Sequence, residues 1–316
     1  MRAGNRHGEL EEILLRLEKG KISTEDAIEK ITVQAPISYN EINHRESLEE
    51  LIKELDRMIG LEKVKKLVKE IYAYIEIQKK RKEEGLIAEP LVMHMIFKGN
   101  PGTGKTTVAR LLGKIFWKMG ILEKGHLVEV ERADLVGEYI GHTAIKVREQ
   151  IKKSLGGILF IDEAYSLARG GEKDFGKEAI DALVKGMEDY KENLILILAG
   201  YQEEMDCFLK SNPGLKSRFP IHIDFPDYEL DELIRIAESI VEKRQYKLSI
   251  SAKAKLSKLI TQKRMEDHVL SGNARLVRNL IERAIRKQAV RLQKTGSFSR
   301  EDLLTIKGED IAEGDV

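Results

Sequence analysis

The residues best suited to chemistry form a glycine-rich segment from Gly99 to Thr106, which reads Gly-Asn-Pro-Gly-Thr-Gly-Lys-Thr. This segment fits the pattern Gly-x4-Gly-Lys-Thr, whose glycines let successive backbone N–H groups face phosphate oxygens. Lys105 is then placed to neutralise the β- and γ-phosphates, and Thr106 to bind Mg²⁺. An apolar run precedes the segment, and a helix is expected from Thr107 to Lys118. This context predicts a site for a nucleoside triphosphate.

Two adjacent carboxylates form the second candidate for chemistry. Asp162 and Glu163 directly follow the apolar run Ile158–Ile161, which lies far enough beyond Lys105 to be a separate strand of the same sheet. We expect Asp162 to hold Mg²⁺ through water and Glu163 to polarise the attacking water. Together with the glycine-rich segment, the pair predicts that the triphosphate is bound and cleaved.

The elements that must position these residues follow an alternating pattern. Short apolar runs, each expected to be a buried strand of a mostly parallel sheet, occur at Leu91–Phe97, Leu127–Val130, Ile158–Ile161 and Leu194–Leu198. Helical patterns lie between them, as the crossovers of an α/β sheet require. Beyond Pro226 no further strand of this kind is expected. The helices expected there are Leu230–Lys243, Ala252–Arg264 and Ala274–Lys294, which form a second, all-helical domain.

The chain is expected to have three parts. Residues 1–44 are interpreted as an N-terminal helical hairpin and linker, with a solvated flexible arm as the alternative. Residues 45–226 are expected to form the α/β nucleotide-binding domain, which opens with helical patterns at 48–55 and 64–84. Residues 227–316 are expected to form the helical domain.

Composition bounds the class of protein. The chain has 316 residues, of which 42% are hydrophobic and 34% charged, and its net charge of +1 offers no overall attraction for nucleic acid or membranes. Cys207 is the only cysteine, which fits a reducing compartment. No apolar run approaches the roughly 20 residues of a membrane span, and the N-terminus lacks a signal-peptide apolar region. We expect a cytoplasmic protein without membrane insertion or a nucleic-acid partner.

The motifs together resemble the AAA+ ATPases over about residues 45–310. The resemblance rests on Gly99–Thr106, on Asp162-Glu163 and on Gly272-Asn273-Ala274-Arg275. Further stretches, Arg132–Thr143, Asp162–Leu167 and Asn212–Phe219, are similar to the CbbX/CfxQ branch, which includes red-type Rubisco activases. The resemblance implies a P-loop NTPase fold, in which helices flank a parallel sheet and a small helical lid follows. It also implies Mg²⁺-dependent hydrolysis of ATP.

The resemblance assigns further roles to individual residues. Arg218 would be an arginine finger that reaches the γ-phosphate of a neighbouring subunit, and it would join Glu163 and Lys105 as the catalytic set. Tyr139, Ile140 and Gly141 match a pore loop that grips a polypeptide. The residues expected to bind nucleotide are Ile59, Gly60, Gly99, Asn100, Pro101, Gly102, Thr103, Gly104, Lys105, Thr106, Thr107, Asp162, Tyr201 and Arg275.

Two further features of the sequence concern the sensor position and the last helix. Many AAA+ proteins carry an Asn just after the fourth strand, but here Tyr201 and Gln202 follow Gly200, so either side chain is a candidate for that sensor position. The last helix is basic, and we interpret its charges as a solvated or subunit-facing surface; they are Arg278, Arg283, Arg286, Lys287, Arg291 and Lys294.

The function implied is a ring of identical subunits, a hexamer by resemblance, that couples ATP hydrolysis to remodelling of an unidentified partner polypeptide. Similarity within the branch to a sporulation protein implies a setting in bacterial spore formation. The alternatives are a nucleotide-dependent assembly switch and a remodeller like the Rubisco activases. A DNA-handling AAA+ protein is disfavoured by the net charge and by the pore-loop match at Tyr139.

Overall fold

The computed structural model describes residues 46–87, 92–139, 141–169, 174–266, 273–296 and 298–311. The hairpin and linker expected for residues 1–44 therefore lie outside the described residues, as do Ile140 and Gly272. Leu48–Val316 cluster by their internal contacts as one unit, separate from Met1–Ser47. The first described helices are α4 (Leu48–Arg57) and α5 (Glu62–Glu83).

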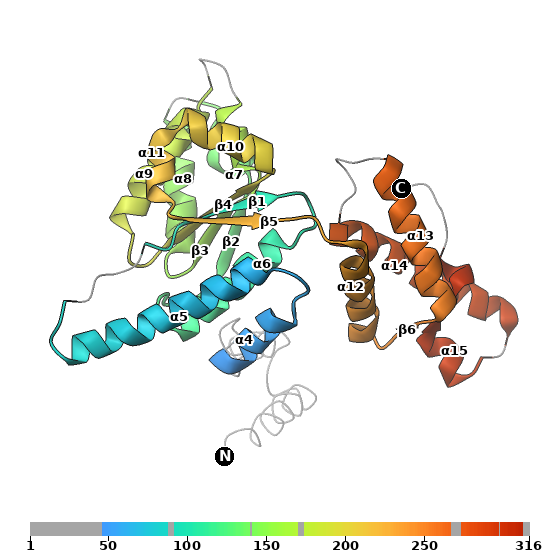
Figure 1. The fold of residues 1–316 in the computed structure, drawn as a ribbon. Helices are drawn as coiled ribbons and strands as arrows, with labels where there is room; N and C mark the ends of the chain where they lie inside the picture. Colours follow the sequence, from blue (N-terminus) through green and yellow to red (C-terminus); the bar gives the residue numbers. More distant parts are fainter. Residues whose placement is uncertain are drawn as a thin grey trace, which may run out of the picture. The chain divides into compact units, whose positions relative to one another are not determined.

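A five-stranded parallel sheet forms the centre of the α/β domain (Figure 1). The strands are β1 (Met95–Gly99), β2 (Leu127–Val130), β3 (Ile158–Ile161), β4 (Ile195–Gly200) and β5 (Ile221–Phe225). Their order is β2-β3-β4-β1-β5, and every neighbouring pair is parallel. Parallel strands end at a common edge, so the residues after β1, β3 and β4 meet there.

Alternation along the strands divides the core into two layers. On one face, Phe97 and Phe160 pack with apolar residues of α4, α5 and α6 (Lys105–Lys118). On the other face, Ile96, Leu159 and Ile161 pack with the segments that follow β2, β3 and β4. These segments are α7 (Arg132–Leu135), α8 (His142–Ser154), a 3₁₀ turn (Ala164–Ala168), α9 (Gly176–Asp189), α10 (Gln202–Ser211) and α11 (Pro213–Arg218). The predicted sheet flanked by helices is confirmed.

The domain after β5 is built on three helices, α12 (Leu230–Lys243), α13 (Ile250–Glu266) and α14 (Asn273–Thr295). Its own core contains Leu233, Leu256 and Ile281. The expectation of an all-helical domain needs one correction, because β6 (Lys247–Leu248) and β7 (Thr305–Ile306) form a short parallel pair. The short helix α15 (Arg300–Leu304) and a 3₁₀ turn (Gly308–Asp310) complete the described part of this domain.

The last described residues are anchored to α14 by an ion pair. Arg291 donates two hydrogen bonds to the Asp310 carboxylate, at 2.8 and 2.9 Å, and Asp310 is only 1% exposed. This contact corrects the interpretation of Arg291 as a surface charge. No helix in the described residues is both long and apolar enough to cross a membrane.

Candidate functional site

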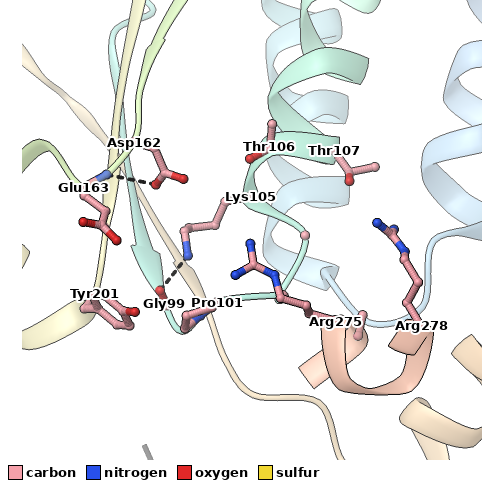
Figure 2. A pocket seen from close by; sticks show the side chains of 14 residues that line it. Gly99, Pro101, Lys105, Thr106, Thr107, Asp162, Glu163, Tyr201, Arg275 and Arg278 are labelled. Carbon is pink, nitrogen blue, oxygen red and sulfur yellow. Dashed lines mark hydrogen bonds between the residues drawn. The ribbon is translucent and has the colours of Figure 1, made fainter. Parts of the chain in front are cut away.

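A pocket lies at the carboxyl edge of the sheet, where the glycine-rich loop after β1 meets the residues after β3 and β4 (Figure 2). Part of its wall comes from the start of α14. The residues that line it are Gly99, Pro101, Gly102, Gly104, Lys105, Thr106, Thr107, Asp162, Glu163, Gly200, Tyr201, Ala274, Arg275 and Arg278. The motifs predicted from sequence to bind phosphate, magnesium and the attacking water thus share one cavity.

Glycine is required where the loop leaves β1. Gly99 has a φ of +156°, and a Cβ atom built there would lie 2.2 Å from the carbonyl oxygen of Phe225 in β5. The loop is closed by Thr103, whose hydroxyl donates to the Asn100 carbonyl at 2.7 Å. Gly104, with a φ of +100°, then caps the N-terminus of α6. The free N–H groups and the dipole of that helix end favour an anion at this point.

The Lys105 ammonium lies at the bottom of the loop. It donates to the carbonyl oxygens of Gly99 at 2.7 Å and Asn100 at 3.0 Å. Burial lowers the pKa of Lys105, while the Asp162 carboxylate raises it and the Arg275 guanidinium lowers it further. A half-buried ammonium whose hydrogen bonds go to two carbonyl oxygens is well placed to turn toward a phosphate, which would offer it a full opposite charge.

The two carboxylates after β3 have different local geometry. The backbone N–H of Glu163 donates to the Asp162 carboxylate at 2.9 Å. Glu163 has a φ of +46°, in the left-handed region that non-glycine residues seldom adopt. Strain of this kind persists where the surrounding structure imposes it, and it is common at functional sites. Here it accompanies a turn that places both carboxylates in the pocket lining.

Tyr201 occupies the pocket wall next to Glu163 (Figure 2). Of the two sensor candidates, Tyr201 is in the lining and Gln202 is not. The Tyr201 ring lies 6.0 Å from that of Tyr165, which is buried. A Cβ atom at Gly200 would come within 2.7 Å of the Tyr165 ring, so a glycine is needed for this ring to pack there.

The helical domain after β5, which is the expected lid, reaches the pocket through Asn273, the first residue of α14. Its side-chain amide donates to Asp227 at 2.8 Å and to the Pro101 carbonyl at 3.4 Å, and its side-chain oxygen accepts from the Tyr228 N–H at 3.0 Å. The next backbone N–H, of Ala274, donates to the Gly102 carbonyl at 3.2 Å. Asn273 is 2% exposed and has a φ of +34°. Its side chain therefore joins the glycine-rich loop, the connection after β5 and the lid.

The connection between β5 and α12 completes this network. Asp227 accepts two hydrogen bonds from the Asn100 side chain, both at 3.0 Å. Tyr228 donates its hydroxyl hydrogen to the Thr103 carbonyl at 3.0 Å, and burial raises the pKa of Tyr228 to about 12. The phenol thus stays protonated and able to donate at any physiological pH. Displacement of the lid would have to break contacts made directly by the loop.

Replacing Asn273 with Ala is expected to destabilise the protein by about 1–3 kcal/mol, because the buried N–H of Tyr228 loses its acceptor and Asp227 loses one of its donors. We also expect weaker ADP binding, because the loop loses its tie to the lid. Urea unfolding and calorimetric titration with ADP measure the two effects. Asn279→Ala is the matched control, since Asn279 is exposed on the same helix. Equal stability and ADP affinity in the two variants would contradict a linking role for Asn273.

Four residues expected to act on nucleotide lie outside the described lining. Asn100 and Thr103 form the loop's internal hydrogen bonds, as above. Ile59 and Gly60 lie in the turn between α4 and α5, and Gly60 has a φ of +66°. A Cβ atom at Gly60 would lie 3.0 Å from a Glu232 carboxylate oxygen and 3.5 Å from the Tyr228 ring. The turn therefore faces the connection to the lid.

Arg218 also lies outside the pocket lining, at the end of α11. Its guanidinium donates from Nε and Nη2 to one oxygen of Glu188, at 2.8 and 2.6 Å, and from Nη1 to the Gly214 carbonyl at 3.0 Å. The Arg218 side chain is 38% exposed. Arg218 is thus a partly exposed cation whose guanidinium is held in place by Glu188 and by the Gly214 carbonyl.

Tyr139 projects into solvent between α7 and α8, with 65% of its surface exposed. Its ring meets that of His142 edge-on, with centroids 5.4 Å apart. The base of this loop is firmly held, because the buried Thr143 hydroxyl accepts from the Gly137 N–H at 3.0 Å. Gly141 has a φ of +82°. A large aromatic side chain on an anchored loop is suited to contact a partner.

Sequence reasoning missed three lining residues, Gly200, Ala274 and Arg278. Arg278 was interpreted as part of a solvated or subunit-facing surface; it is exposed, and it also lines the pocket. The available signal was its spacing, since residues three apart on a helix share one face and Arg275 was already assigned to the nucleotide.

The residues present fit a magnesium ion bound together with a triphosphate. Thr106 offers a hydroxyl and Asp162 a carboxylate within the same lining. Mg²⁺ takes few protein oxygens and is completed by phosphates and water. In the described ranges no group of three or more His, Cys, Asp or Glu side chains is arranged to hold a metal.

Comparison with known sequences identifies both domains. Residues 95–227 match the ATPase family associated with various cellular activities (AAA), and residues 229–315 match the AAA lid domain. Stage V sporulation protein K of Bacillus subtilis is 58% identical over 280 residues, covering 88% of this chain and 87% of that protein. The chloroplastic ribulose bisphosphate carboxylase/oxygenase activase of Cyanidioschyzon merolae is 43% identical, covering 84% and 91%. Protein CfxQ of Xanthobacter flavus is 44% identical, covering 84% and 83%.

Solved structures support the same fold. The FIGL-1 AAA domain in complex with ADP aligns with a TM-score of 0.53 at 16% identity, covering 81% of this chain and 80% of that chain. The RuvB Holliday junction branch migration motor of Thermotoga maritima aligns with a TM-score of 0.51 at 20% identity, covering 81% and 69%. Likeness at this level of identity concerns the arrangement of the sheet and the lid.

Proposed function

Because this chain belongs to the AAA ATPases, related to stage V sporulation protein K and to the CfxQ proteins, we propose that it uses ATP hydrolysis to remodel a partner polypeptide. One observation carries the proposal. Lys105, Glu163 and Arg275, which come from a loop, a strand end and the lid, line one pocket. A triphosphate bound there would contact both domains, so its cleavage would change the contacts between them.

Five polar side chains of the pocket have distinct parts in the proposed reaction. The loop N–H groups and Lys105 hold the β- and γ-phosphates in place. Mg²⁺, held by Thr106 and by Asp162 through water, would offset the negative charge of the phosphates when bound. Glu163 accepts a proton from the water that attacks the γ-phosphorus and fixes its orientation. Tyr201, beside Glu163, donates its hydroxyl hydrogen to the same water or to the γ-phosphate.

Arg218 is proposed to complete the site of a neighbouring subunit. Its position outside the lining of its own pocket, together with a partly exposed guanidinium, supports action on another copy. Contacts that pair a site on one copy with a different surface of the next generate rings when they close. We therefore propose a homo-oligomeric ring, with six subunits by resemblance to the family.

Tyr139, Ile140 and Gly141 are proposed to grip the partner. The exposed ring of Tyr139 offers apolar contact to many sequences. Lys146 of α8 reinforces the base of the loop by donating to the carbonyls of Ala133 and Val136 at 3.1 and 3.0 Å. Because Ala133 lies in α7, which follows β2 directly, movement of the sheet edge would be transmitted to the tyrosine.

Replacing Tyr139 with Ala is expected to keep basal ATP hydrolysis within about twofold and to abolish partner remodelling. The reason is that the ring lies on an exposed loop, outside the lining of the pocket. Phosphate release is measured with and without a partner captured on the Glu163→Gln variant with ATP. Tyr190→Ala, which removes another half-exposed tyrosine, is the control. Unchanged remodelling would favour the alternative, a nucleotide-dependent assembly switch.

The setting and organisation are proposed from the family relationship. Similarity to stage V sporulation protein K supports a role in bacterial spore formation, and we propose that the protein acts in the cytoplasm. One relative is an activase of ribulose bisphosphate carboxylase/oxygenase, and this relationship supports a carboxylase of that kind as a second candidate partner. We propose domain limits of 1–44, 45–226 and 227–316. The first of these parts is proposed to take no part in binding or cleaving the nucleotide. ATP hydrolysis that is unchanged by DNA, with no salt-dependent DNA binding, would support the absence of a nucleic-acid partner.

A further inference from the structure

We propose that Arg278 is a second lid arginine of the nucleotide site, which binds the phosphate chain at its α-phosphate end and therefore holds ADP and ATP alike. The proposal rests on the function proposed above and assigns a new residue to that site. Arg278 lines the pocket, although it lies outside every motif from which the site was predicted.

The first support is placement along α14. Arg275 and Arg278 are three residues apart, which puts them on one helix face, about one turn apart. Both line the pocket. In Figure 2 the Arg275 guanidinium points toward the side of Lys105, whereas that of Arg278 points toward Thr107. The two arginines thus face different parts of the loop and its helix.

The second support concerns which phosphate each arginine would meet. Lys105 marks the β- and γ-phosphates, and the loop backbone cradles the α- and β-phosphates. In Figure 2 the Arg275 guanidinium lies on the side of Lys105, whereas the Arg278 guanidinium points away from Lys105 toward Thr107. Arg275 is therefore the arginine on the γ-phosphate side. Arg278 lies on the side of Thr107 and would therefore bind the α-phosphate.

The third support is charge. Within the described ranges Arg278 is exposed and makes no ion pair, whereas Arg291 of the same helix is paired with Asp310. An unpaired guanidinium that faces a cavity is suited to a phosphate, because its fork matches two phosphate oxygens. The pocket carries two carboxylates, Asp162 and Glu163, both of which the proposed reaction uses for magnesium and water.

The two lid arginines would therefore bind different phosphates of the nucleotide. Loss of the γ-phosphate removes the partner of Arg275 but leaves the α-phosphate for Arg278. The lid then remains attached to the core through Arg278 after hydrolysis. ADP and ATP would both gain affinity from Arg278, and only ATP would gain the full contribution of Arg275.

The test is calorimetric titration of full-length variants with ADP and with a non-hydrolysable ATP analogue. Arg278→Ala is expected to raise both dissociation constants by a similar factor, about 10-fold to 100-fold, as loss of a charge-assisted contact implies. Arg275→Ala is expected to raise the constant for the analogue more than that for ADP. Arg286→Ala, which removes an exposed charge from the same helix, should change neither. Arg278→Lys should recover part of the affinity.

Three outcomes decide the matter. An unchanged ADP constant in Arg278→Ala, with binding abolished in Lys105→Ala, would overturn the inference and leave the site intact. A rise for the ATP analogue alone would overturn the α-phosphate assignment. Full nucleotide binding in Lys105→Ala would instead contradict the proposed function. Thermal unfolding of each variant without nucleotide checks folding, and an exposed helical Arg→Ala change should leave the melting temperature unaltered.

Discussion

Replacing Glu163 with Gln is expected to leave ATP bound while slowing its hydrolysis by about 10²–10⁴-fold, the range that a positioned general base contributes. The amide has nearly the shape of the carboxylate, but it cannot accept the proton of the attacking water. The backbone N–H of Glu163, which donates to Asp162, remains in place. Phosphate release gives the rate, and titration with ATP gives the affinity.

Glu203→Gln is the matched control for this experiment, because Glu203 is an exposed residue of α10, outside the pocket lining. It should hydrolyse ATP at the rate of the unchanged protein. Turnover near that rate in Glu163→Gln would exclude Glu163 as the base and leave Tyr201 as the remaining side chain proposed to contact the water. Loss of ATP binding in the same variant would point instead to a role in holding magnesium.

Replacing Arg218 with Ala is expected to reduce hydrolysis by about 10³-fold or more in the assembled protein, the range found for arginine fingers. The guanidinium stays charged and presents a fork of donors to the developing charge on the γ-phosphate. Its present partner, Glu188, is more than half exposed, so the pair is weak enough to exchange for a phosphate. ATP binding to a single subunit should be unaffected, and titration at low protein concentration measures it.

Mixing two inactive variants tests whether Arg218 acts between subunits. Arg218→Ala keeps its own Lys105, and Lys105→Ala keeps its own Arg218. In a mixed ring the first variant supplies the pocket and the second the finger, so hydrolysis should return to a measurable fraction of the unchanged rate. Each variant alone, at the same total concentration, is the control. No recovery in a ring shown by light scattering to be mixed would place Arg218 outside the reaction of its neighbour.

Most elements of the fold follow from local patterns in the sequence. The runs Leu127–Val130 and Ile158–Ile161 form strands with the expected bounds, and Leu230–Lys243 forms a helix with the expected bounds. β5 (Ile221–Phe225) was missed because it is an edge strand whose apolar residues alternate with His222 and Asp224. A continuous apolar run is typical of a strand buried on both faces, and β5 lacks such a run.

The site divides in the same way between local and long-range features. Gly99–Thr106 and Asp162-Glu163 are continuous segments, so their chemistry can be predicted from the sequence. The network around Asn273 is not, because its partners Pro101 and Asp227 are distant in the chain and meet only after the sheet and lid have folded. Arg278 was missed for a related reason. The basic residues of α14 cannot be told apart in the sequence, and only the folded structure shows which of them line the pocket.

The shared wall of the pocket has a consequence for synthesis of the protein. Domains generally fold as units while the chain emerges from the ribosome, N-terminal part first. The sheet and its glycine-rich loop would be complete once β5 had emerged, but the Pro101 and Gly102 carbonyls would still lack their partners from α14. A nascent chain at that stage would lack the part of the pocket wall that Ala274, Arg275 and Arg278 supply. High-affinity binding would begin only when the start of α14 docks, so the growing chain would acquire its ligand late.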